Sequence, residues 1–221
     1  MRHEIVVFLG PSLERSAAEQ LLTARYAPPA KRGDIAQAVA GGARIITLID
    51  GVFFQNDAVG HREILSALKS GVRVIGASSM GALRAAELHT LGMEGIGLIY
   101  QLYRDGVLIS DDEVALVYDP ESYAPLSEPL INIRCTLKRA VESGMLGKET
   151  AGILKEIAIS CYFPDRTWDT LYESAISLIP APDLERFMVF VRENAVDQKK
   201  MDAIAALTRT SALAKELGIF R

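Results

Sequence analysis

The chain has 221 residues, of which 49% are hydrophobic and 24% charged, as in an ordinary globular protein with one large core or a core and an extension. Its net charge of −4 lacks the basic footprint of nucleic-acid binding, and no apolar run reaches the roughly 20 residues that span a bilayer. The N-terminus has no signal-peptide stretch, and the two cysteines, Cys135 and Cys161, are too few for a disulfide framework or a zinc knuckle. We therefore expect a cytoplasmic protein without a nucleic-acid or membrane partner.

Short apolar runs alternate with helical patterns through the first half of the chain. The expected strands cover residues 4–9, 44–49 and 72–76, and the expected helices cover residues 13–24, 34–41, 58–70 and 80–91. Ser12 is expected to cap the first helix, and Asp34 to open the second with a capping box. Strands that alternate with helices indicate a parallel sheet with helices on its faces.

The second half of the chain reads almost entirely as helix. A helix is expected over residues 95–105 and a short strand over 114–118. Further helices are expected over residues 130–143, 148–160, 167–178, 182–194 and 197–217. The predicted architecture is an α/β core over residues 1–125, and a helical extension over 126–221 that packs on it.

Three stretches follow the expected strands, so they meet at the carboxyl edge of the sheet, where ligands of such folds bind. These stretches are residues 10–12, 50–57 and 77–80. We expect Gly10, Ser12, Asp50 and Gly51 to contact a substrate there.

The stretch over residues 77–81, Ala-Ser-Ser-Met-Gly, fits a nucleophile elbow with Ser79 at its centre. In that interpretation the amides of Met80 and Gly81, at a helix N-terminus, stabilise an oxyanion, and Ser78 supports the corner. The alternative is that Ser78 or Ser79 only caps the following helix.

A nucleophilic serine needs a base, and two side chains are candidates. His61 shares a helix face with Ile64 and Leu68, so it is expected to point inward, as a base or as a core histidine. Lys31 belongs to a segment that has to return toward the carboxyl edge before the next short helix. It is a candidate base there, or a solvated loop lysine.

Other charged and glycine-containing stretches favour simpler interpretations. Arg84 and Glu87 are spaced as an i, i+3 ion pair, although Arg84 is also placed to hold a substrate carboxylate. The acidic turn at residues 111–113 is either a hard-cation site or solvated, and we expect no metal. Residues 10–12 lack the glycines of a dinucleotide loop and the lysine of a P-loop, so no cofactor is expected.

Seven motifs in this order resemble one family. They are residues 8–12 (FLGPS), 28–35 (PPAKRGDI), 49–53 (IDGVF), 61–65 (HREIL), 76–88 (GASSMGALRAAEL), 111–114 (DDEV) and 128–134 (EPLINIR). Together they are similar to the TfuA-like proteins, the partners of YcaO enzymes in peptide backbone thioamidation.

The resemblance implies a hydrolase that releases sulfide from the thiocarboxylate end of a ThiS-like sulfur carrier, using a Ser–Lys pair that maps to Ser79 and Lys31. It implies three partners: a YcaO enzyme, the carrier, and through the YcaO enzyme a precursor peptide. A homo-oligomer is also compatible with it. The alternatives are a non-catalytic adaptor that binds a YcaO enzyme and its peptide, and a serine hydrolase of small esters.

Overall fold

The computed structural model describes residues 4–53 and 57–220, and its internal contacts divide the chain into two compact units. The first unit comprises Met1–Asp111 and Lys199–Arg221, and the second comprises Asp112–Gln198. This division differs from the boundary expected at 125/126, because the contacts break earlier and the last helix belongs to the first unit.

The first unit contains a five-stranded sheet with the order β2-β1-β3-β4-β5, in which every pairing is parallel. The strands are β1 (Ile5–Phe8), β2 (Arg25–Ala27), β3 (Ile45–Leu48), β4 (Arg73–Ala77) and β5 (Glu94–Ile96). All residues of β1 and β3 are buried, as expected for central strands covered on both faces. The predicted parallel sheet is confirmed.

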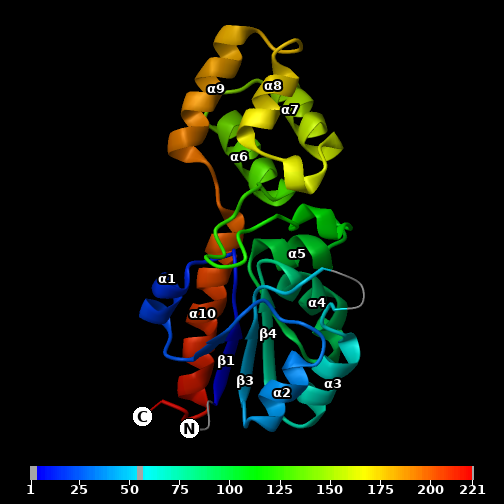
Figure 1. Ribbon diagram of the computed structural model, residues 1–221, viewed down its shortest axis with the longest axis vertical. Helices are drawn as coiled ribbons and strands as arrows, with labels where there is room; N and C mark the ends of the chain where they lie inside the picture. The colour runs from blue at the N-terminus through cyan, green and yellow to red at the C-terminus, as the bar shows by residue number, and fades with distance from the viewer. Residues whose placement is uncertain (1–3, 54–56, 221) are drawn as a thin grey trace. The chain divides into compact units, whose positions relative to one another are not determined.

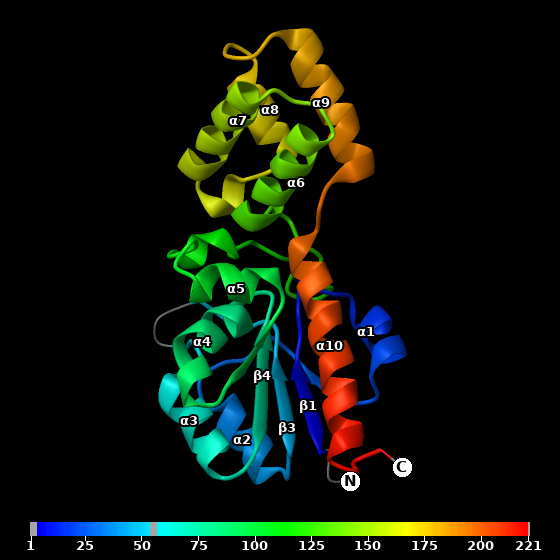
Figure 2. The ribbon, with the colours of Figure 1, turned by 180° about the vertical axis from the view of Figure 1, so that it is seen from behind.

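The direction of each crossover decides which face a helix covers, because connections between parallel strands are right-handed. The helices are α1 (Arg15–Leu21), α2 (Asp34–Ala40), α3 (His61–Lys69), α4 (Met80–Leu88), α5 (Leu98–Arg104) and α10 (Gln198–Glu216). The chain turns from β1 toward β2 through α1, and in the opposite direction through α2, α3 and α4. Accordingly, Figures 1 and 2 show α1 and α10 on one face of the sheet and α2 to α5 on the other.

One hydrophobic cluster of the first unit lies on the face of the sheet that α10 covers. Ala203, Ala206 and Leu207 of α10 pack in one buried cluster with residues of β1, β3 and β4 and with α1. Inside this interface, the buried Thr210 hydroxyl donates to the Ala206 carbonyl and accepts a hydrogen bond from the Thr47 hydroxyl at 2.7 Å. Helix α10 is therefore an integral layer of the α/β unit.

The second unit is a cluster of helices with its own core. Its helices are α6 (Leu130–Glu142), α7 (Lys148–Ser160), α8 (Trp168–Ala175) and α9 (Ala181–Asn194). Leu137, Leu154, Leu171 and Phe187, one from each helix, belong to a single buried cluster. The predicted helical C-terminal portion is confirmed. In neither unit does a described helix have the length and apolarity needed to cross a membrane.

Two strands were not predicted, and one predicted strand does not form. β2 and β5 have only three residues each, and Gly95 interrupts the sequence pattern of β5 by which a strand is predicted. That glycine is required, because a Cβ there would lie 2.2 Å from the ring of Tyr100. Residues 114–118 form no strand, and the described pairing there is one isolated bridge between Tyr118 and Pro125.

Both predicted helix caps are wrong. Helix α1 starts later than expected, with Glu14 at the N-cap position, because the Ser12 hydroxyl is used elsewhere. Helix α2 follows Gly33 in the left-handed region (φ 93°), and the Asp34 carboxylate accepts a hydrogen bond from the Lys31 amide at 2.8 Å. The aspartate therefore closes the loop before the helix and does not form a capping box.

Candidate active site

A buried carboxylate organises the carboxyl edge of the sheet. Asp50, 2% exposed, follows β3 and accepts hydrogen bonds from the amides of Gly10 (2.8 Å) and Ser12 (3.2 Å) and from the Ser12 hydroxyl (2.7 Å). The Ser78 hydroxyl, which is fully buried, donates to the Ser12 hydroxyl at 2.9 Å. The three predicted stretches thus converge, although residues 54–56 lie outside the described part. The side chains of Asp50 and Ser12 are therefore hydrogen-bonded to each other.

The corner between β4 and α4 is a strained turn. Ser78 has a φ of 65°, which is uncommon for a residue other than glycine, and the Ser79 amide donates to the Ala77 carbonyl at 2.8 Å. This is a three-residue γ-turn centred on Ser78. Ser79 occupies the N-cap position of α4, but its hydroxyl makes no capping hydrogen bond. The capping interpretation is therefore wrong for both serines, since the Ser78 hydroxyl binds Ser12.

The two amides expected to form an oxyanion site differ in their contacts. The Gly81 amide donates to the Ile49 carbonyl at 3.3 Å, and a Cβ on Gly81 would lie 1.7 Å from the Leu48 carbonyl oxygen. Gly81 therefore serves the close packing of α4 on β3, and its amide is already used in a hydrogen bond to Ile49. The Met80 amide has no hydrogen-bond partner among the described residues, so it is the donor available beside Ser79.

Lys31 returns to the carboxyl edge as expected, but it is not joined to Ser79. Next to it, Ala30 forms a parallel bridge with Gly51, in which the Ala30 amide donates to the Asp50 carbonyl at 2.9 Å. Gly51 in turn lies against the side chain of Met80. The Lys31 side chain is exposed, and no hydrogen bond between Lys31 and Ser79 occurs in the described structure.

His61 and Arg84 bind the same carboxylate. The expected inward orientation of His61 is wrong, because α3 begins at this residue and leaves it exposed, with Nε2 2.7 Å from Glu87 Oε2. Arg84 donates to Glu87 Oε2 at 2.7 Å and to the Val59 carbonyl at 2.9 Å, which confirms the predicted Arg84–Glu87 pair. These contacts tie the start of α3 to α4.

Comparison with known families decides the identity of the chain. A family model described as TfuA-like protein matches residues 50–167, more than half of the chain, including the corner at Ser79. The chain belongs to the TfuA-like family. This family is associated with YcaO-dependent thioamidation and with YcaO partners. None of the curated proteins compared with the chain matches it.

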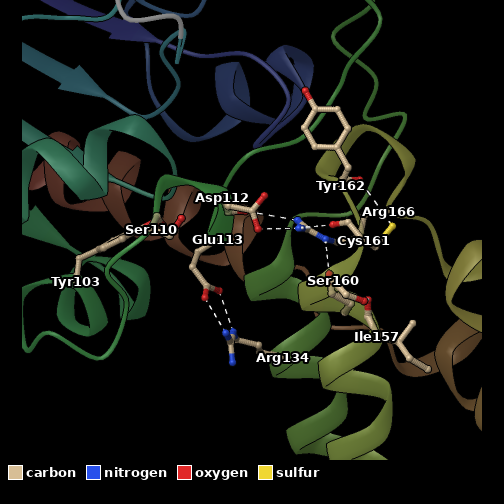
Figure 3. Close-up of polar contacts among 11 residues, drawn as sticks. Tyr103, Ser110, Asp112, Glu113, Arg134, Ile157, Ser160, Cys161, Tyr162 and Arg166 are labelled. Atoms are coloured by element: carbon tan, nitrogen blue, oxygen red, sulfur yellow. Dashed lines mark hydrogen bonds and ion pairs between the residues drawn. The ribbon is translucent and has the colours of Figure 1, made fainter.

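In this TfuA-like protein, the acidic turn at residues 111–113 is bound by arginines. Glu113 accepts two hydrogen bonds from Arg134, at 2.8 and 2.9 Å, and Asp112 accepts one from Arg166 at 2.7 Å (Figure 3). Arg166 is fully buried and also donates to the Ala158 and Cys161 carbonyls. The solvated interpretation is therefore wrong for both carboxylates. Among the residues that the structure describes, no group of three His, Cys, Asp or Glu is placed to hold a metal ion.

Two further buried charges at the sheet edge were missed by the sequence analysis. Lys199 and Asp202, only 2% and 3% exposed, lie one helical turn apart at the start of α10. Asp202 accepts hydrogen bonds from the amides of Leu98 (3.1 Å) and Ile99 (2.8 Å), directly after β5. Since β5 is the neighbour of β4, Lys199 is a second lysine at the carboxyl edge. A charged i, i+3 pair on a largely apolar helix was the available signal.

Proposed function

We propose that this TfuA-like protein hydrolyses the thiocarboxylate terminus of a ThiS-like sulfur carrier and so releases sulfide for YcaO-dependent thioamidation. The observation that carries this proposal is the corner of β4 and α4. There, the Ser79 hydroxyl makes no capping hydrogen bond and lies next to the Met80 amide, at the N-terminus of a helix, for which the described residues offer no hydrogen-bond partner.

In the proposed reaction, the Ser79 oxygen attacks the thiocarboxylate carbon, and the serine proton passes to a base. The Met80 amide stabilises the charge on the tetrahedral oxygen. Collapse of this intermediate breaks the carbon–sulfur bond while the protonated base gives the serine proton to the sulfur, so that hydrosulfide leaves. Water then hydrolyses the acyl-serine ester, which restores the Ser79 hydroxyl and gives the carrier a carboxylate. Because thiolate is a far better leaving group than an amine, a modest Ser–Lys pair suffices.

The base in this proposal is Lys31, with Lys199 as the second candidate. A lysine accepts a proton only in its neutral form, which removal from water favours. Lys31 is exposed in the free protein, so the bound carrier would have to cover it and bring it to Ser79. Lys199 is buried already. A catalytic hydrogen bond that forms only in the complex is compatible with the free geometry.

The test is sulfide release from purified thiocarboxylated carrier, in single-turnover reactions. Ser79→Ala should lower the rate by at least about 10²-fold, and loss of the base should lower it about 10²–10⁴-fold. Lys31→Met and Lys199→Met identify the base. Ser66→Ala and Lys69→Met, on the exposed side of α3, are the matched controls. Unchanged release by Ser79→Ala would refute the proposal.

A specific observation also favours the adaptor function. In the second unit, the large apolar side chains of Ile176, Leu178 and Val189 are each more than half exposed, so they are accessible to a partner. An adaptor would support thioamidation fully after Ser79→Ala, and would lose that support when these three side chains are replaced by serine. A thioamidation assay with the YcaO enzyme, the peptide and ATP distinguishes the two functions.

A further inference from the structure

The conformation of Ser78 has to be maintained by its surroundings. In the described part of the chain, only Ser78 and Tyr123 combine a side chain with a positive φ. Such conformations persist where neighbouring groups fix them, and they cluster at functional sites. Tyr123 lies in a surface turn, whereas Ser78 is fully buried and immediately precedes the proposed nucleophile.

A directional chain of hydrogen bonds ends on Ser78. The Ser12 hydroxyl donates to Asp50 Oδ1 at 2.7 Å, and a hydroxyl has a single proton to donate. The Ser12 oxygen is then left to accept the proton of Ser78. Asp50 Oδ2 is occupied by the amides of Gly10 and Ser12, which keeps the carboxylate itself in place.

We propose that Asp50 and Ser12 are positioning residues, which hold Ser78 in its left-handed conformation and thereby fix the turn that presents the Ser79 hydroxyl and the Met80 amide. The inference rests on the proposed function where it concerns catalysis. Where it concerns the turn, it rests only on the hydrogen bonds and the backbone conformation. In this role, the Ser78 hydroxyl acts as an anchor and takes no part in the chemistry.

Glycine at position 78 separates anchoring from chemistry. Glycine adopts a positive φ without steric cost, so Ser78→Gly keeps the turn without the anchor. Ser78→Ala loses the anchor and retains the strain. We therefore expect kcat for sulfide release to fall about 10–100-fold in Ser78→Ala, since small misplacements of reacting groups have effects of this size. Ser78→Gly should recover most of that loss.

The same reasoning predicts that glycine at position 78 partly restores the activity that is lost by substitution of Ser12. Ser12→Ala should lower kcat about as much as Ser78→Ala, with KM for the carrier changed less than about twofold. Asp50→Asn should also lower kcat by this amount, because the NH2 group of asparagine would face groups of Gly10 and Ser12 that donate hydrogen bonds to the carboxylate. The double variant Ser12→Ala/Ser78→Gly should be several-fold faster than Ser12→Ala alone, which loss of general stability does not explain. Ser66→Ala is again the control.

Urea unfolding of the same variants keeps the inference separate from the proposed function. Ser12→Ala should lower the urea midpoint in both backgrounds, because it removes the hydrogen bond to Asp50. The shift should be smaller in the Ser78→Gly background, where the hydrogen bond from Ser78 is already absent. This coupling is expected even if the wild-type protein releases no sulfide, a result that would refute the proposed function alone. Additive midpoint shifts, or a double variant no faster than Ser12→Ala in an active protein, would overturn the positioning role.

Discussion

The close packing of α4 on β3 at Gly81 makes Gly81→Ala an informative substitution. A Cβ at this position would lie 1.7 Å from the carbonyl oxygen of Leu48 and 2.6 Å from its carbon, and neither backbone atom can rotate away. Helix α4 would have to move by about 1.5 Å or more to reach an ordinary van der Waals distance. That shift would also break the hydrogen bond from the Gly81 amide to Ile49.

The cost of this substitution follows from three contributions. Overpacking typically costs about 1–3 kcal/mol, and the lost hydrogen bond about 1 kcal/mol. Alanine returns about 1 kcal/mol through its helix propensity. We expect a net destabilisation of about 1–3 kcal/mol. With a urea m-value of about 2 kcal/mol/M, the midpoint of the first unit should fall by about 0.5–1.5 M.

Two optical signals report on different parts of the chain in this experiment. Trp168 is the single tryptophan and belongs to the second unit, so its fluorescence follows that unit, while far-UV circular dichroism follows both. The matched control is Gly152→Ala in α7, where a new Cβ meets no atom within 4 Å. The control should be stabilised by up to about 1 kcal/mol. If Gly81→Ala is as stable as the control, the close contact of α4 with β3 is refuted.

Three further substitutions test individual interactions by urea unfolding. Arg166→Met should destabilise the second unit by about 3–5 kcal/mol, because a fully buried guanidinium with several hydrogen bonds is lost. The control is Arg186→Met, on the exposed side of α9, which should change stability by less than about 0.5 kcal/mol. Burial raises the pKa of Tyr26 to about 12, so the contribution of Tyr26 to stability is complete below about pH 10 and is lost between about pH 10 and 12. In Tyr26→Phe, the urea midpoint should therefore fall less over this pH range than in the wild-type protein. Burial, and to a smaller extent repulsion by Asp197, raises the pKa of the Glu128 carboxyl. The contribution of Glu128 to stability is therefore complete below its ordinary pKa and is lost as the pH rises through the raised pKa. Glu128→Gln should therefore raise the midpoint at pH 7 but not at pH 4.

Local patterns predicted most of the fold because most elements have their own periodicity. The helices after residue 130 and the three central strands fall close to their expected positions. β2 was missed because three residues before a pair of prolines carry too little pattern. The packing of α10 on the α/β core agrees with the expected packing of the helical extension. Its membership of the first unit was missed, because an apolar helix face indicates burial but not the domain to which the helix belongs.

The candidate site could be predicted only in part. The order of strands and helices placed Ser79 and Asp50 at one edge, since topology alone brings them there. The roles of the side chains depended on contacts across the fold: Asp50 binds Ser12, and His61 binds Glu87. Arg166 could not be found, because its burial depends on acceptors supplied by two separate segments, the end of α7 and the turn at Asp112.

The region shared with the family model is not a folding unit by itself. It begins at Asp50, after β1, β2 and β3, and ends before α10, so a fragment over residues 50–167 retains only β4 and β5 of the sheet. The Asp50 carboxylate would lose Ser12, and the covered face of the sheet would lose the helix that buries it. The family signature therefore marks the corner that carries Ser79, while residues outside the signature give that corner its geometry. The activity of Ser79 has to be tested in the whole chain.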